Sequence, residues 1–151
     1  MIKPSTIKPD VELKNLLTNR ITVGLPGGGT KKVTVYSDWE RPTNGLPDDF
    51  IVVYLNGDIG GYGMDIPFAR GYLMVSLYCK LNDDGSVKKN RVSRILAQFE
   101  ELIEAHISEN FYYEYDAQRF VTPTTPNQSS GYSVTSLNLR WHTNDNIINN
   151  S

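Results

Sequence analysis

Two stretches of the chain place apolar residues at the three- and four-residue spacing of an amphipathic helix. The longer covers residues 87–108, where charged and polar side chains fall mostly opposite an apolar stripe of Val92, Ile95, Leu96, Phe99, Leu102, Ile103 and His106. The shorter follows Asp10, which can act as an N-cap, and ends near Arg20. The pattern therefore predicts a short N-terminal helix and one long amphipathic helix.

Alternation of apolar and polar positions predicts strands over residues 21–25, 33–39, 71–81 and 132–142. The clearest is 71–81, where one face carries Leu73, Val75, Leu77, Cys79 and Leu81. Its other face carries two tyrosines and a methionine, which indicates cover by a neighbouring segment. Residues 50–55 form an almost continuous apolar run that predicts a buried strand, and Tyr113, Tyr115 and Phe120 lie in further extended segments.

Segments rich in proline, glycine and polar residues separate these elements. The first two strands are joined by a hairpin turn or loop at residues 26–29, and the loops 41–49, 57–67 and 122–131 are longer than joining strands requires. Residues 1–9 predict an extended arm, and residues 143–151 a flexible tail. The order of elements predicts a single α+β domain over residues 1–151, with a mainly antiparallel sheet packed by the long helix.

Composition supports a folded domain and limits its partners. Apolar residues make up 39% of the chain, enough for a core without disulfides. Fifteen basic and seventeen acidic residues give a net charge of −2, which argues against a global electrostatic grip on nucleic acid or anionic membranes. No apolar run approaches the length of a membrane helix, and residues 1–10 lack the apolar centre of a secretory signal, so we expect cytoplasmic synthesis.

The residues that usually carry chemistry do not form a recognisable site. One cysteine and two histidines are too few for an ordinary zinc site, and Cys79 falls on an apolar strand face. Asp83 and Asp84 lack the spacing of a calcium loop, and the lysines after Gly29 precede a strand rather than the helix of a phosphate-binding loop. We therefore predict no catalytic residue, cofactor or metal, while an enzyme with a site assembled from scattered residues stays an alternative.

Two groups of residues are candidates for interaction. The first comprises apolar side chains of a glycine-rich loop: Tyr62, Met64, Ile66 and Phe68. The second is a basic cluster at the start of the long helix, opposite in sign to what the helix dipole favours: Lys88, Lys89, Arg91 and Arg94. This cluster is either a contact for phosphate or an acidic partner, or a solvated face balanced by glutamates further along the helix.

The element order and chain length resemble the tail terminator and tail completion proteins of long-tailed bacteriophages. The resemblance is carried by patterns over the helix 10–20, the strands 50–55 and 71–81, the turn 82–85, the helix 91–106 and the closing strand 132–141. It implies a structural virion protein without catalytic residues, which assembles in the host cytoplasm into a ring, commonly a homohexamer. The implied partners are other copies of the chain, the major tail tube protein that the ring caps, and the head–tail connector, with DNA passing through the ring.

The resemblance also assigns roles to the candidate residues. Tyr62, Met64, Ile66 and Phe68 would be buried between subunits or against the tube, and the three long loops would make further contacts. A head-closure or other neck-ring protein fits the same patterns. A small α+β module that binds nucleic acid or a ligand through the basic cluster, with Tyr112 and Tyr113 as aromatic neighbours, is a further alternative.

Overall fold

The computed structural model of the chain describes residues 8–60, 70–105, 111–115, 125–127 and 131–143. Two α-helices, one 3-10 turn and eight strands follow one another within these ranges. In chain order they are α1 (Pro9–Leu17), β1 (Thr22–Gly24), β2 (Thr30–Lys32), β3 (Thr34–Ser37), η1 (Asp38–Glu40), β4 (Asp49–Gly60), β5 (Arg70–Lys80), α2 (Lys89–Ala105), β6 (Phe111–Tyr115), β7 (Thr125–Asn127) and β8 (Tyr132–Thr143).

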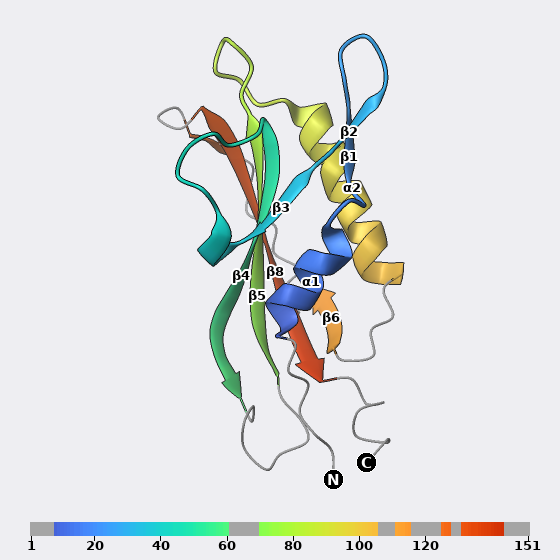
Figure 1. Ribbon diagram of the computed structural model, residues 1–151, viewed down its shortest axis with the longest axis vertical. Helices are drawn as coiled ribbons and strands as arrows, with labels where there is room; N and C mark the ends of the chain where they lie inside the picture. The colour runs from blue at the N-terminus through green and yellow to red at the C-terminus, as the bar shows by residue number, and fades with distance from the viewer. Residues whose placement is uncertain (1–7, 61–69, 106–110, 116–124, 128–130, 144–151) are drawn as a thin grey trace.

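The main sheet has the order β3-β4-β5-β8-β6, and β7 pairs with the start of β8 (Figure 1). All neighbours in it are antiparallel except β3 and β4, which run parallel. Strands β1 and β2 form a separate antiparallel hairpin. The predicted α+β class with a mainly antiparallel sheet is confirmed.

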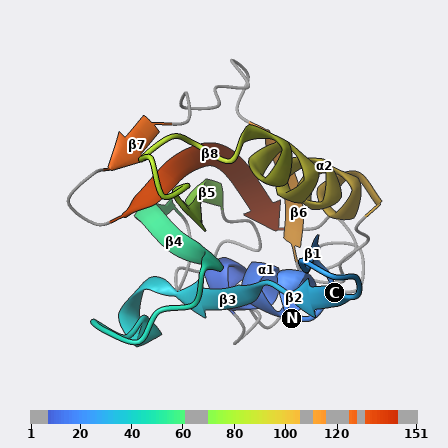
Figure 2. The same cartoon turned by 90° about the horizontal axis from the view of Figure 1, so that it is seen from above.

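Both helices cover the same face of the sheet, as the view from above shows (Figure 2). The predicted alternation explains this arrangement, because successive strand residues point to opposite faces. Leu73, Val75 and Leu77 of β5 are buried, as are Leu137 and Leu139 of β8. They meet the apolar stripe of α2, whose buried members are Val92, Ile95, Phe99 and Ile103. The predicted core face of β5 is therefore confirmed.

The bounds of both helices differ from those predicted. Helix α2 begins at Lys89 rather than at residue 87. Helix α1 begins at Pro9, which takes one residue from the expected arm 1–9, and Lys8 rather than Asp10 is its N-cap. Proline suits the first turn because its missing N–H has no intrahelical partner there. Asn19 has φ 66°, a left-handed conformation that asparagine tolerates, so the helix does not reach Arg20. Residues 1–7 and the last three residues of the expected second helix lie outside the described ranges.

The expected strand 33–39 is shorter at both ends. Strand β3 begins at Thr34, because Val33 separates it from β2, and it stops at Ser37, where the 3-10 turn η1 begins. Ser37 and Glu40 form a capping box, in which the Ser37 N–H donates to Glu40 Oε1 at 2.9 Å. Glu40 also pairs with Lys14 of α1, and these contacts lower the pKa of the Glu40 carboxyl. The serine–glutamate spacing was present in the sequence as a turn signal.

Four expected loop or tail boundaries are wrong. Strand β4 begins at Asp49, the last residue of the expected loop 41–49. Strand β4 continues to Gly60, because β5 pairs with it beyond the expected end at residue 55. Strand β7 lies inside the expected loop 122–131, where it pairs with residues 132–134. Its Pro126 is acceptable because β7 is an edge strand. Strand β8 includes Thr143, so the expected tail 143–151 loses its first residue, and the others lie outside the described ranges.

Gly71 of β5 makes room for the largest core side chain. It is the register partner of Trp141 on β8, which is 1% exposed. A Cβ at position 71 would lie 2.9 Å from Trp141 Nε1, closer than real Cβ atoms approach such a neighbour. The indole is packed in the core and has little room to move.

We expect Gly71→Ala to destabilise the protein by about 1–3 kcal/mol, because the added methyl group overpacks the core against Trp141. Urea unfolding measures this change. Gly24→Ala is the matched control, since Gly24 also lies in a strand but a Cβ there meets nothing within 4 Å. Equal stability of the two variants would contradict the tight fit at Gly71.

Candidate interaction surface

The apolar loop candidates Tyr62, Met64, Ile66 and Phe68 all fall within residues 61–69, outside the described ranges. Their role as contact residues stays a prediction. The basic cluster and the hairpin, in contrast, are described, and they lie together at one end of the molecule (Figure 1).

Arg91 of the basic cluster is engaged inside the protein. Its Nε donates to Asp49 Oδ1 at 2.9 Å and its Nη2 to Asp49 Oδ2 at 2.6 Å, a bidentate ion pair between α2 and the start of β4. Asp49 is only 7% exposed. These hydrogen bonds raise the pKa of the guanidinium, which keeps its charge. The primary role of Arg91 is therefore structural, as the ion-pair partner of Asp49.

The other members of the cluster are more accessible. Lys89 and Arg94 are exposed, Lys88 is partly buried, and none of the three forms an ion pair with a described residue. Among the described residues, therefore, three positive charges of the cluster, rather than four, have no ion-pair partner. Sequence alone could not separate Arg91 from its neighbours, because Asp49 is 42 residues away along the chain.

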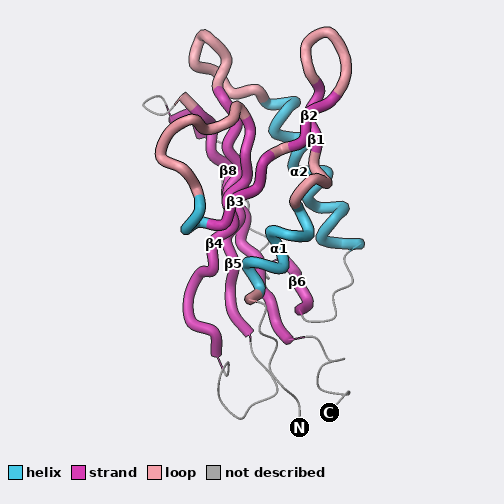
Figure 3. The backbone as a smooth tube through the Cα atoms, in the orientation of Figure 1, coloured by secondary structure: helices cyan, strands magenta, loops and turns pink. Residues whose placement is uncertain are grey.

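Side chains of α2 hold the β1–β2 hairpin in place. Arg91 Nη1 donates to the Gly24 carbonyl at 3.3 Å. Two turns further along α2, the Gln98 side chain forms hydrogen bonds with both backbone groups of Thr22. It accepts from the Thr22 N–H at 2.9 Å and donates to the Thr22 carbonyl at 2.8 Å. Strand β1 of the hairpin is therefore fixed to the helix at both of its ends, and the turn projects beyond the sheet (Figures 1 and 3).

The turn of this hairpin presents an apolar side chain in a defined backbone. Gly27, Gly28 and Gly29 have φ of 86°, 102° and 81°, a region that glycine enters without steric cost. The Leu25 N–H donates to the Gly29 carbonyl at 3.1 Å, which closes the turn. Leu25 itself is 42% exposed, and Lys31 and Lys32 on the other strand of the hairpin are exposed as well. The predicted hairpin turn is confirmed.

An aromatic cluster holds the loop after η1 against the face of the sheet opposite the helices. Phe50 and Tyr78 stack with their ring centroids 4.6 Å apart, and Tyr132 packs edge-on against Phe50. The Tyr132 hydroxyl donates to the Pro47 carbonyl at 2.8 Å, and Arg41 Nη1 donates to the Tyr78 hydroxyl at 3.2 Å. In the sequence, the tyrosines on the second face of the predicted strand 71–81 indicate that a neighbouring segment covers this face of the sheet.

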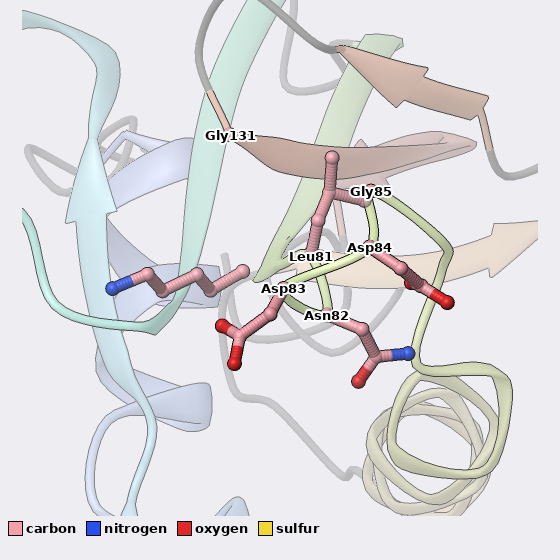
Figure 4. A pocket seen from close by; sticks show the side chains of 7 residues that line it. Leu81, Asn82, Asp83, Asp84, Gly85 and Gly131 are labelled. Atoms are coloured by element: carbon pink, nitrogen blue, oxygen red, sulfur yellow. The ribbon is translucent and has the colours of Figure 1, made fainter.

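A shallow depression lies at the turn between β5 and α2 (Figure 4). Its polar groups satisfy one another: Asp84 Oδ1 accepts from the Ser86 N–H at 2.9 Å, and Asn82 Nδ2 donates to Ser86 Oγ at 3.0 Å. The bonds from Ser86 lower the pKa of the Asp84 carboxyl. This is the hydrogen-bonded turn that the sequence predicted at residues 82–86.

The groups that could support catalysis are dispersed. Cys79 is fully buried, and burial together with the charge of Asp49 raises the pKa of its thiol to about 12. Within the described ranges, no three histidine, cysteine or acidic side chains gather as metal ligands. None of the helices in those ranges has the length and apolar character needed to cross a bilayer.

Tyr112 and Tyr113 lie far from the basic cluster. They belong to β6, which lies toward the opposite end of the molecule from the first turn of α2 (Figure 1). Tyr113 is buried, and its hydroxyl donates to the Pro9 carbonyl at 2.9 Å, so it ties β6 to α1. Tyr112 is exposed and packs beside His142. The described structure therefore does not bring these tyrosines and the basic residues into one binding surface.

We expect Arg91→Ala to lower stability by about 2–3 kcal/mol, because it leaves the buried Asp49 carboxylate without its ion pair and releases the end of β1 from α2. Urea unfolding and hydrogen exchange of the hairpin amides measure the two effects. Arg94→Ala, at an exposed position of the same helix, is the control and should change stability by less than about 0.5 kcal/mol. Indistinguishable effects of the two substitutions would argue against the structural role of Arg91.

The Cys79 thiol should react slowly in the folded protein. A rise in pKa from 9.0 to about 12 leaves roughly 1,000-fold less thiolate at neutral pH, and burial restricts access as well. A colorimetric disulfide reagent at pH 8 should label Cys79 rapidly only in denaturant, whereas Leu25→Cys adds a thiol that reacts at once. Equal rates for the two thiols in the native protein would contradict this prediction.

Comparison with models of known protein families gives no match to the chain. Comparison with curated proteins likewise gives no match. Fold geometry and the residues described above are therefore the basis of the functional proposal.

Proposed function

We propose that the protein is a structural component of a bacteriophage virion, a tail terminator or tail completion protein that acts by binding. Copies of the chain form a ring, with six subunits as the expected number. The ring caps the tail tube and joins it to the head connector. Its work is done by surface contacts, and no residue of the chain serves as a catalyst.

The observation that carries the proposal is the fixed, projecting hairpin. Its turn contributes no side chain to the core cluster, yet Arg91 and Gln98 form hydrogen bonds that hold strand β1 of the hairpin against α2. A segment ordered before binding loses less conformational entropy when it docks. Leu25 supplies an exposed apolar contact at the turn, which suits a flat or grooved protein surface such as the end of a tube.

The α+β fold also supports the proposal, because its elements occur in the order on which the resemblance rests. A head-closure or other neck-ring protein would use the same features against a different partner. The partner distinguishes the two: a terminator binds the end of the tail tube, whereas a head-closure protein binds the connector.

Sedimentation velocity and native mass measurement test the ring, and electron microscopy of reassembled tail tubes tests the capping. We expect a closed oligomer of one fixed mass that binds tube ends. Leu25→Asp should abolish capping while leaving the ring mass and the stability of the subunit unchanged within about 0.5 kcal/mol, and Leu25→Met should cap normally. A protein that stays monomeric at high concentration, with and without tubes, would rule out the proposal.

A further inference from the structure

The two segments that meet at the hairpin carry basic side chains and no acidic ones. Residues 13–37, which include both hairpin strands, contain four basic residues, and residues 85–99, which include the N-terminal part of α2, contain four more, while all seventeen acidic residues lie elsewhere in the chain. The hydrogen bonds of Arg91 and Gln98 to β1 hold the two segments together. The turn at residues 82–86, which carries two aspartates, projects separately from the hairpin (Figures 1 and 2). Positive charge is therefore concentrated where the hairpin lies against α2.

Two of these eight basic side chains are neutralised within the protein. Lys14 pairs with Glu40, and Arg91 pairs with Asp49. The other six form no ion pair with a described residue. Five of the six lie at exposed positions: Arg20, Lys31, Lys32, Lys89 and Arg94. Most of the positive charge of the two segments is therefore accessible to a partner.

Three of the exposed basic residues surround the contact between β1 and α2. Thr22, whose backbone is hydrogen-bonded to the Gln98 side chain, is the register partner of Lys32 on β2. Gln98 Nε2 also donates to the carbonyl of Arg94, one turn earlier in α2, at 3.1 Å. Arg20 precedes Thr22 by two residues. The helix and both arms of the hairpin thus contribute basic groups to one surface.

An exposed apolar side chain accompanies these charges. Leu25 follows the end of β1, and Lys31 and Lys32 lie on the other strand of the hairpin. An apolar centre with a polar rim is the usual composition of a protein–protein interface. Single-stranded nucleic acid, in contrast, stacks its bases on aromatic rings, and the exposed tyrosines of the described chain, Tyr72 and Tyr112, belong to β5 and β6. The composition of the hairpin surface therefore favours a protein partner.

We propose that the basic hairpin surface, formed by Arg20, Lys31, Lys32 and Arg94 around Leu25, docks onto an acidic protein surface with an apolar recess for the leucine. This inference rests on the proposed function and names the chemistry of the tube end that the hairpin caps. Opposite charges speed the encounter of two surfaces and fix their orientation. Outside the two basic segments the chain has seven basic against seventeen acidic residues, so its remaining surface repels an acidic partner.

Charge reversal on β2 tests the docking surface. The double variant Lys31→Glu, Lys32→Glu should bind tail tubes at least about tenfold more weakly in co-sedimentation, because it places like charges against the acidic partner. The double variant Lys31→Arg, Lys32→Arg keeps the charge and should bind normally. Lys8→Glu with Lys80→Glu is the matched control, since both positions are exposed, lie outside the basic hairpin surface and change the net charge by the same amount. This control should bind tubes within about twofold of the unmodified protein.

Two further measurements address the partner. Raising the salt concentration from about 0.1 M to about 1 M shortens the Debye length from about 10 Å to about 3 Å, so tube binding should weaken at least about tenfold. Tubes whose exposed carboxyl groups have been amidated with carbodiimide and glycinamide should not be capped. Tubes treated with glycinamide alone should be capped normally. A DNA duplex of about 20 base pairs should bind at least about tenfold more weakly than tubes do, and equally to the unmodified protein and the charge-reversed variant.

The outcomes separate this inference from the proposed function. Capping that survives charge reversal, high salt and amidation of the tubes overturns the acidic partner and leaves the tail terminator standing. Charge reversal on β2 that changes the mass of the ring rather than capping overturns the inference in favour of a contact between copies. Duplex binding that is tighter than tube binding and is lost on charge reversal overturns it in favour of nucleic acid. Absence of capping by the unmodified protein under all conditions overturns both proposals.

Discussion

The ion pair between Arg91 and Asp49 is the contact on which the arrangement of the other elements depends. It joins α2 to the first residue of β4, and the same guanidinium reaches the Gly24 carbonyl at the end of β1 in the hairpin. Burying a carboxylate costs free energy unless a well-oriented partner compensates, and the bidentate geometry meets that condition. The pair thereby fixes where the helix, the sheet and the hairpin meet, which apolar packing alone leaves less precisely defined.

Much of the fold could be predicted because the core follows local periodicity. Leu73, Val75 and Leu77 lie on the face that alternation assigned to the core, and the apolar stripe of α2 covers it. The errors have different causes. The end of β3 at Ser37 has a local signal, the capping box between Ser37 and Glu40. The continuation of β4 to Gly60 and the formation of β7 depend on pairing with β5 and β8, so no local pattern reports them.

The candidate surface was less predictable than the core. Among the four basic residues, Arg91 is distinguished from its neighbours only by a carboxylate 42 positions earlier in the chain. The exposed Leu25 is not predictable as a contact residue, because a single apolar residue beside the glycines of a turn carries no pattern. The apolar residues Tyr62 to Phe68 stay a sequence-based prediction. Surface function depends on which segments the fold places together, and that information is not local.

The position of β8 has a consequence for how the chain acquires its structure. This strand is made after all the other described elements, yet it lies inside the sheet, between β5 on one side and β6 and β7 on the other. Trp141, Leu137 and Leu139 complete the core from this strand. Contacts of such large sequence separation form slowly. The nascent polypeptide therefore cannot finish its core while residues 132–143 are still inside the ribosome, and folding must be completed after they emerge.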